Sequence, residues 1–343
     1  MNFASDNHYG ASPQILAALG AVGTAPAPAY GGDPITVRVR EKLCAIFERE
    51  VAVHPVINGT TANSLSLATL VPPHGAVLCH EEAHIAVDEC GAPEFFTHGA
   101  KLVPIDGADA KLTPAAIART LTRFQRGAVH HSQPMAVSIT QATELGTVYT
   151  PGEIAAIGDL AHREGMKVHM DGARFANALV GLGCSPAEMT WKSGVDVLSF
   201  GATKNGALAA EAVIFFNPPD ARDFEYRRKK SGHLLSKMRF VSAQLDAYLA
   251  DDLWLANARR ANELAQRLAQ GLARANAVSI AHPVGANAVF ARMPEALAAK
   301  LRAAGGVFYD WGAPASDGTV LTRLMLSFAT PERDVAKFVE LAS

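Results

Sequence analysis

The sequence predicts an α/β protein with a mainly parallel central sheet, covered by helices on both faces, and a smaller α+β region near its carboxyl end. The first observation is an alternation of strand-type and helix-type segments between residues 51 and 216. The second is a change of character near residue 220, after which Ala-, Leu- and Arg-rich helical patterns run from about 240 to 275. Parallel strands need helical crossovers, which cover both faces of the sheet, so the alternation favours this class.

The alternating segments can be assigned in chain order from their apolar periodicity. A helical pattern over 35–50 places Ile35, Val39, Leu43 and Phe47 on one face. Strand patterns in the large region cover 51–57, 76–79, 102–105, 135–140, 167–170, the segment that begins at 195, and 212–216. The helical patterns between them cover 61–70, 84–90, 114–124 and 151–164. Strand candidates in the last part of the chain are 278–280, 288–291 and 321–328.

We therefore expect three parts along the chain. Residues 1–34 are rich in Gly, Pro and Ala and indicate an extended arm. Residues 35–240 are expected to form a large domain, and residues 241–343 a small carboxyl-terminal domain. The basic run 227–230 is expected either to be a solvated helix face or to contact an anion at a subunit interface.

The composition is that of an ordinary globular protein. With 49% hydrophobic residues, 19% charged residues and a net charge of −2, nothing marks a nucleic-acid or membrane-surface partner. No apolar stretch reaches the roughly 20 residues that span a membrane, and the amino terminus lacks a signal-peptide pattern. The cysteines have no CxxC spacing, which favours reduced thiols in the cytoplasm. They are Cys44, Cys79, Cys90 and Cys184.

Two strand ends carry the residues that point most directly to chemistry. Asp171 follows the strand pattern 167–170, and Lys204 follows the strand that begins at Val195. The carboxyl ends of parallel strands face a common crevice. Burial lowers the pKa of a lysine and frees its amine to form a Schiff base, and an Asp and a Lys are the main protein groups of a pyridoxal phosphate (PLP) site. If each residue is considered alone, there is an alternative interpretation: Lys204 lies in a surface loop, and Asp171 caps the next helix.

The strand–helix junction 58–63 offers an anion-binding end for such a site. Gly59 permits a tight turn, Thr60 adds a hydroxyl, and the helix N-terminus adds free N–H groups and a favourable dipole for a phosphate. An ordinary turn with a helix cap is the alternative. No GxGxxG or GxxxxGK[ST] sequence opens any of the expected helices, so the sequence gives little support to dinucleotide or nucleoside triphosphate binding.

The segment His80-Glu-Glu-Ala-His84 matches the letters of the zinc motif HExxH. His80 is expected to end a strand, so the two histidines would not share the helical face that zinc requires. Three interpretations follow: a zinc hydrolase using His80, Glu81 and His84; a structural histidine; or His84 lying flat over a cofactor ring. We expect no metal site.

Taken together, these segments resemble the threonine aldolase family, within the aspartate aminotransferase-like, fold type I PLP enzymes. The segment Asp-Gly-Ala-Arg with a downstream Thr-Lys-Asn-Gly is the most specific part of the resemblance, and the matching pieces span nearly the whole chain. These pieces are Phe3–Asn7, Tyr30–Pro34, Asn58–Thr60, Glu82–His84, His169–Phe175, Ser199–Gly206 and Leu321–Leu324.

The resemblance implies how this chain would hold PLP in its large domain. Lys204 would bind the cofactor as a Schiff base, and Asp171 would pair with the pyridine nitrogen. Gly59 and Thr60 would bind the phosphate. His84 would stack on the ring and assist a proton transfer at the substrate hydroxyl.

The resemblance also implies how the amino acid substrate would be held. Ser5, Arg174 and Arg323 would grip its carboxylate, with Arg174 also close to the cofactor, since arginine suits a bidentate hold. Tyr30 would lie near the site and face a neighbouring subunit. Arg228 would reach a neighbouring phosphate. Family members are commonly homotetramers, dimers of dimers with shared active sites.

One segment departs from the pattern of better-known relatives. Residues Gln141-Ala-Thr-Glu144 occupy a strand end where those relatives carry Asn-Thr-His. A histidine near the substrate hydroxyl is therefore missing, and Glu144 or Thr143 stands in its place at the substrate. Which residue acts as the base stays open.

The implied reaction is retro-aldol cleavage of a β-hydroxy-α-amino acid to glycine and an aldehyde. Threonine, allo-threonine and phenylserine are the candidate substrates. Three alternatives stay open: another fold type I activity, by β-elimination or amino transfer; a non-catalytic protein on the same scaffold; and the zinc hydrolase.

Overall fold

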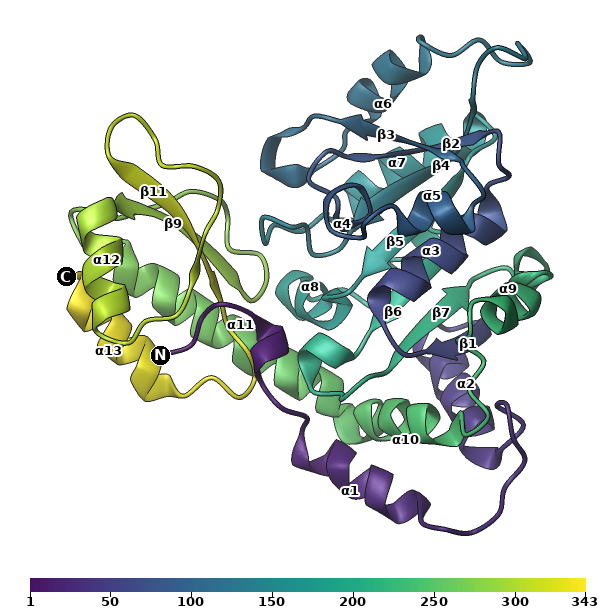
Figure 1. Cartoon of the computed structure of the whole chain (residues 1–343), viewed down its shortest axis with the longest axis horizontal. Helices are drawn as coiled ribbons and strands as arrows, with labels where there is room; N and C mark the ends of the chain where they lie inside the picture. The colour runs from purple at the N-terminus through teal and green to yellow at the C-terminus, as the bar shows by residue number, and fades with distance from the viewer.

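The structure is a computed structural model that describes residues 1–343. Two sheets organise the chain, one of seven strands and one of four (Figure 1). The strands of the large sheet are β1 (Ala52–Val56), β2 (Gly75–His80), β3 (Lys101–Ile105), β4 (Gln133–Thr140), β5 (Lys167–Gly172), β6 (Val197–Gly201) and β7 (Glu211–Phe215). Those of the small sheet are β8 (Ser279–Ile280), β9 (Ala288–Pro294), β10 (Tyr309–Asp310) and β11 (Thr319–Met325).

The helices start at residues that suit helix N-termini. Asp33, Thr113 and Thr150 each accept a hydrogen bond from a backbone N–H of the first turn, and each is followed by proline. The first helices are α1 (Pro13–Val22), α2 (Pro34–Ile46), α3 (Gly59–Leu70), α4 (His84–Val87), α5 (Ala92–Phe96), α6 (Pro114–Leu121), α7 (Pro151–Arg163) and α8 (Phe175–Leu182). The later ones are α9 (Phe224–Lys230), α10 (Arg239–Tyr248), α11 (Leu253–Leu272), α12 (Glu295–Ala303) and α13 (Glu332–Ala342).

The large sheet is mainly parallel, as predicted. Its strand order is β1-β7-β6-β5-β4-β2-β3, and β7 alone runs antiparallel to its neighbours. Because β7 is reversed, its first residue lies at the edge where the other strands end, and Glu211 pairs with Gly201 of β6. The parallel strands and β7 thus present side chains to one common edge.

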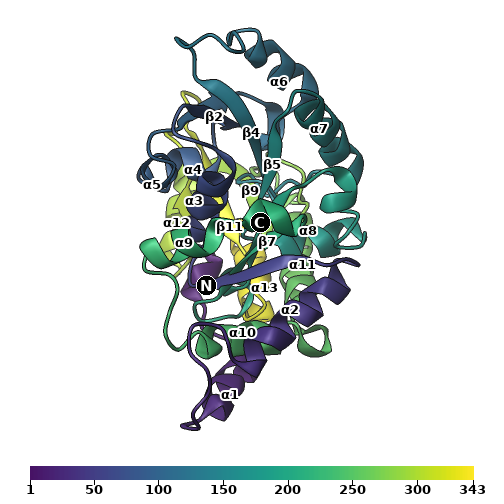
Figure 2. The same cartoon turned by 90° about the vertical axis from the view of Figure 1, so that its right-hand side faces the viewer.

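Helices cover both faces of this sheet. Figure 2 shows α6 and α7 along one side, with α3, α4 and α5 along the other. All residues of β2, β6 and β7 are buried, as expected for strands sandwiched between helical layers. Of the predicted helix face, Val39, Leu43 and Phe47 are fully buried in the main core, and Ile35 is half-buried. No helix has the length and apolar character required to cross a membrane.

The amino-terminal segment differs from the extended arm that the sequence predicts. Residues 13–22 form α1, which begins at Pro13 and buries Ile15. The first residues join the carboxyl-terminal part of the chain: Asn2 forms a bridge with Val307, and Phe3 packs edge-on against Phe338 at 5.1 Å. The chain start is therefore part of the small sheet's core, and it leads from there to α1 (Figure 1).

Candidate active site

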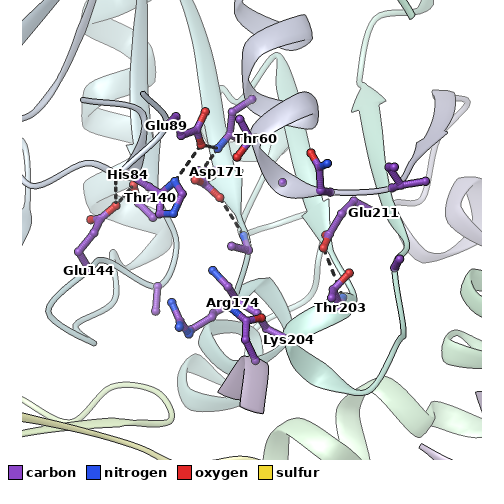
Figure 3. Close-up of a pocket in the computed structure, with 18 of the residues that line it drawn as sticks. Thr60, His84, Glu89, Thr140, Glu144, Asp171, Arg174, Thr203, Lys204 and Glu211 are labelled. Carbon is purple, nitrogen blue, oxygen red and sulfur yellow. Dashed lines mark hydrogen bonds and ion pairs between the residues drawn. The ribbon is translucent and has the colours of Figure 1, made fainter. Parts of the chain in front are cut away.

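A cavity of about 300 Å³ lies at the edge of the large sheet where its parallel strands end. This is the place that the topology of a parallel sheet favours for a ligand. Seven of the residues predicted from the sequence line it, and all of them except Gly59 are labelled in Figure 3. They are Gly59, Thr60, His84, Glu144, Asp171, Arg174 and Lys204.

Lys204 sits in a single turn of 3-10 helix, Thr203–Asn205, directly after β6. It is half-buried, and burial lowers the pKa of its amine, with the Arg174 charge acting in the same direction. The turn ends at Gly206, whose φ is +116° and where a Cβ would meet Ser12 Oγ at 2.3 Å. Only glycine fits there, so the position of the lysine is set by close packing of the turn.

Glu211 holds the turn from the neighbouring strand. Its Oε2 accepts from Ala202 N at 3.0 Å, and its Oε1 accepts from Thr203 N at 3.4 Å. The carboxyl is buried, which raises its pKa to about 7. Both of its oxygens are therefore used to fix the backbone that carries Lys204.

Asp171 belongs to a hydrogen-bonded chain that runs along one wall of the cavity (Figure 3). His84 Nδ1 lies 2.9 Å from Glu89 Oε1, which accepts from Asn63 Nδ2 at 2.9 Å. Asn63 Nδ2 also donates to Asp171 Oδ2 at 2.8 Å, and Ala173 N donates to Asp171 Oδ1 at 3.0 Å. The orientation of Asp171 is thus set from both sides. The hydrogen bond to Glu89 raises the pKa of His84, and burial raises the pKa of Glu89.

Glu144 follows β4 and stands on the same wall as His84. Its Oε1 accepts from the backbone N–H of His84 and from Thr140 Oγ1, both at 2.9 Å. Its Oε2 is shielded from solvent and has no hydrogen-bond partner. Burial, assisted by the Asp171 charge, raises the pKa of Glu144 to about 7.

Thr143, the other candidate for a position near the substrate hydroxyl, does not line the cavity. Its side chain is buried beneath the cavity wall, where its hydroxyl bonds Thr147 Oγ1 at 2.8 Å and Asp109 O at 3.3 Å. A hydroxyl engaged in this turn cannot reach a substrate, so Glu144 alone remains at that position.

The N-terminus of α3 forms the anion-binding end of the cavity. Asn58 caps the helix by accepting from Thr61 N at 2.9 Å. The first N–H groups of the helix, those of Gly59 and Thr60, have no partner within a helix and open at the cavity wall. This is the arrangement that binds phosphate groups.

Arg174 lines the cavity but is already paired. Its Nε and Nη2 donate to the two carboxylate oxygens of Asp6 at 2.8 and 3.0 Å. Asp6 is buried and also accepts from Asn287 Nδ2 at 3.2 Å. Burial alone would raise the pKa of Asp6, but the Arg174 guanidinium holds it below its usual value. The remaining nitrogen of Arg174, Nη1, has no partner within the chain and is free to meet a ligand.

Ser5 and Arg323 do not line the cavity. Ser5 Oγ accepts from Asn7 N at 3.1 Å and caps a short turn of 3-10 helix, Asp6–His8. Arg323 Nη2 donates to Ala4 O at 3.3 Å, and its guanidinium lies 5.0 Å from the centre of the Trp311 ring. Both residues therefore hold the amino-terminal segment that carries Asp6.

Tyr30 and Arg228 also lie outside the cavity of their own chain. Tyr30 is 51% exposed, with Lys229 Nζ 5.0 Å from its ring centre. Arg228 is buried, and its guanidinium donates to Pro55 O at 3.0 Å and to Glu225 Oε2 at 2.8 Å. The guanidinium is thus bonded inside its own chain, and its contact with a neighbouring subunit's phosphate stays a prediction.

The zinc interpretation fails on geometry. His80 ends β2 and His84 begins α4, so the two rings do not share a helix face. His80 Nε2 bonds Gly107 O at 2.9 Å, and its Nδ1 accepts from Glu82 N at 3.1 Å. No group of three or more His, Cys, Asp or Glu side chains could hold a metal ion.

Four side chains of the site were not assigned a role from the sequence. They are Asp6, Asn63, Glu89 and Glu211. Asn63 could have been found, because it lies four residues after Gly59 and so on the same helical face. The other three make contacts that no local pattern encodes.

Comparison with known proteins agrees with this geometry. The chain matches the beta-eliminating lyase family model over residues 2–296. It is 45% identical to the low specificity L-threonine aldolase of Pseudomonas aeruginosa over 340 residues, 99% of this chain and 95% of that protein. The protein of the same name from Pseudomonas sp. is 44% identical over 341 residues, 99% of this chain and 96% of that protein.

Solved structures extend the comparison to the fold. Leishmania major threonine aldolase superimposes with a TM-score of 0.93 at 28% identity, covering 99% of this chain and 98% of that one. An aspartate aminotransferase from Rhodobacter sphaeroides shares the fold, with a TM-score of 0.71 at 19% identity over 100% of this chain and 92% of that one. The chain therefore belongs to the beta-eliminating lyase family and, within it, to the threonine aldolases, which are fold type I, PLP-dependent enzymes.

Proposed function

We propose that this protein cleaves a β-hydroxy-α-amino acid to glycine and an aldehyde, with PLP bound at Lys204. Threonine and allo-threonine are the expected substrates, and phenylserine is a further candidate. The observation that carries the proposal is the amine of Lys204, with its lowered pKa, in one cavity with a buried Asp171. The names of the Pseudomonas relatives support threonine as the substrate.

The residues of the cavity fit PLP. An amine, a carboxylate and a helix N-terminus stand around a single space, as an aldehyde, a pyridine nitrogen and a phosphate require. Asn63 Oδ1 and Glu89 Oε2 are buried in its wall without partners, which costs roughly 1–3 kcal/mol each until a polar group or water meets them. Lys204, Asp171, His84, Gly59 and Thr60 would hold the cofactor. When bound, PLP supplies an electron sink for the electron pair left on the substrate Cα.

The protein side chains then have separable tasks. Glu211 keeps the Lys204 turn in place, and Asn63 keeps Asp171 in one orientation. Nη1 of Arg174 binds the substrate carboxylate, while Asp6 holds the rest of its guanidinium. The hydrogen bond to Glu89 raises the pKa of His84 and so favours its protonated form, which would donate a hydrogen bond toward the substrate.

The test is an analysis of products from PLP-loaded protein given threonine. Acetaldehyde and glycine in equal amounts are expected, whereas a keto acid with ammonia would indicate β-elimination instead. The Lys204→Ala variant should lose cofactor colour and fall in rate by at least about a thousandfold. Lys101→Ala, which changes an exposed lysine at the start of β3, is the matched control and should behave as wild type.

We further propose a cytoplasmic homotetramer, built as a dimer of dimers with shared active sites. Leu208 lines the cavity yet is 59% exposed, so an apolar side chain stands at the cavity mouth with room for a second subunit to cover it. The exposed Tyr30 would face the partner in the same arrangement. The four cysteines are unpaired, which supports a reducing compartment. Light scattering checks the assembly, and Leu208→Asp should shift it toward monomer.

A further inference from the structure

One carboxylate oxygen on the cavity wall lacks a protein partner while its twin has two. Glu144 Oε1 receives hydrogen bonds from His84 N and Thr140 Oγ1, so the side chain is held in one orientation. Oε2 of the same carboxyl is shielded from solvent and receives none. A buried acceptor without a donor is destabilising, so an O–H or N–H group is the contact that Oε2 lacks.

The neighbouring groups narrow the choice of a proton acceptor. Asp171 has both oxygens engaged, by Asn63 and Ala173. His84 is bonded to Glu89 through Nδ1, and this contact favours its protonated form. Both features make His84 a better hydrogen-bond donor than proton acceptor at this wall. Glu89 also has an unpartnered oxygen, Oε2, but its side chain is fully buried and forms an ion pair with His84. Glu144 is the carboxylate of this wall that is only half-buried, is held in place through Oε1 and has an unpartnered second oxygen.

The charge state of Glu144 is set by the groups that face it from every side. Burial and the Asp171 charge disfavour the anion, and the His84 N–H favours it, so its pKa is raised to about 7. An acid with that pKa can take and release a proton near neutral pH. The titratable groups around it are Asp171, His84, Arg174, Cys79 and Tyr149.

We propose that Glu144 is the general base that removes the proton from the β-hydroxyl of the substrate. This inference rests on the proposed function and names the group that starts the bond cleavage. The hydroxyl proton passes to Oε2 of Glu144, and the O–H bonding pair becomes the second carbon–oxygen bond of the aldehyde. The Cα–Cβ bond breaks and leaves its electron pair on Cα. A proton added at Cα completes glycine, and Glu144 returns its proton to solvent.

The test compares two reactions of the PLP-loaded Glu144→Gln variant. Glutamine keeps the acceptor oxygen for His84 N and Thr140 but cannot take a proton. Threonine cleavage should fall by about 10²–10⁴-fold, the usual contribution of a general base. Exchange of the glycine Cα proton in D₂O should stay close to the wild-type rate, because glycine has no β-hydroxyl. Equal loss of both reactions, or unchanged cleavage, would overturn the proposal.

The dependence on pH gives a second readout. In wild type, kcat/KM for threonine should rise with pH through about 7, because the anion of Glu144 is the active form, and this limb should be absent in Glu144→Gln. Glu144→His, which restores a titratable base, should recover part of the rate. A histidine variant no more active than the glutamine variant contradicts the role.

A third readout does not depend on activity. An infrared difference titration of cofactor-free wild type against Glu144→Gln should show one carboxyl that ionises near pH 7. A carboxyl that stays protonated at the pH of catalysis has no anion to act as a base, and would overturn the proposal. Failure of the proposed function is distinguishable, since wild type itself would then exchange glycine protons without releasing aldehyde from threonine.

Discussion

Glu144 and Glu211 stand on opposite walls of one cavity, and in both residues burial raises the carboxyl pKa to about 7. Their hydrogen bonds differ. Both oxygens of Glu211 accept from the backbone of the Lys204 turn, whereas Oε2 of Glu144 has no partner. A raised pKa therefore does not identify a catalytic group by itself. In this pair, Glu144 keeps one oxygen that can still meet a ligand, whereas both oxygens of Glu211 hold the Lys204 turn.

The largest expected effect is on the rate of cleavage. Glu144→Gln should lower kcat for threonine by about 10²–10⁴-fold, while Glu211→Gln should lower it by less than about tenfold. The reason is that a glutamine at 211 still accepts a hydrogen bond from Ala202 N and keeps the turn in place. Steady-state kinetics of both variants at one pH make the comparison. Equal losses would show that both carboxyls serve the same purpose.

The next effect is on the free energy of unfolding, and the Glu211→Gln variant isolates the contribution of Glu211 to it. A carboxyl with a raised folded pKa binds its proton more tightly in the folded state, so its contribution stabilises the protein below about pH 4.5 and is lost as pH rises through about 7. Replacing Glu211 by Gln removes this loss. The variant should therefore gain about 1–3 kcal/mol relative to wild type between those two pH values.

Urea unfolding of the cofactor-free proteins across this pH range measures that difference. His169 acts with the opposite sign, because burial lowers its pKa to about 4 and its contribution is lost as pH falls. Subtracting wild type from the variant cancels the His169 contribution. A pH-independent difference between the two proteins would contradict the buried carboxyl as the cause.

The smallest effect concerns a third carboxylate, Asp6, whose oxygens are both bonded to Arg174. Asp6→Asn should raise KM for threonine by about tenfold with little change in kcat, because a misaligned Arg174 holds the substrate carboxylate less well. Asp159→Asn, an exposed change on α7, is the matched control. A fall in kcat at constant KM would instead place Asp6 with the residues that act in the transition state.

The comparison of the three carboxylates also shows what a sequence can reveal about a site. Glu144 was a candidate from the sequence because it stands in a short segment that departs from the family pattern, where better-known relatives carry a histidine. Asp6 and Glu211 were not assigned a role, although both lie within or beside segments that carried the resemblance. Asp6 meets a partner 168 residues away, and Glu211 reaches the Lys204 turn only because β7 is reversed.

Other differences have the same origin. Ser5 and Arg323 lie outside the cavity lining and hold the segment that carries Asp6, so their contact with the substrate carboxylate stays a prediction. Arg228 was expected at a neighbouring subunit's phosphate, and within its own chain its guanidinium is bonded to Pro55 O and Glu225. A polar side chain binds the partners that the folded chain brings within reach, and residue type does not specify those partners.

The sequence by itself determined the alternation of strands and helices, the placement of Asp171 and Lys204 at strand ends, and the helix N-terminus at Gly59. These features depend on apolar periodicity, turn residues and capping, which act over a few neighbouring residues. Only the tertiary structure decided the reversal of β7, the pairing of Asp6 with Arg174 and the free oxygen of Glu144. Those depend on strand order and on how buried polar groups divide the available donors, which are properties of the whole packed chain.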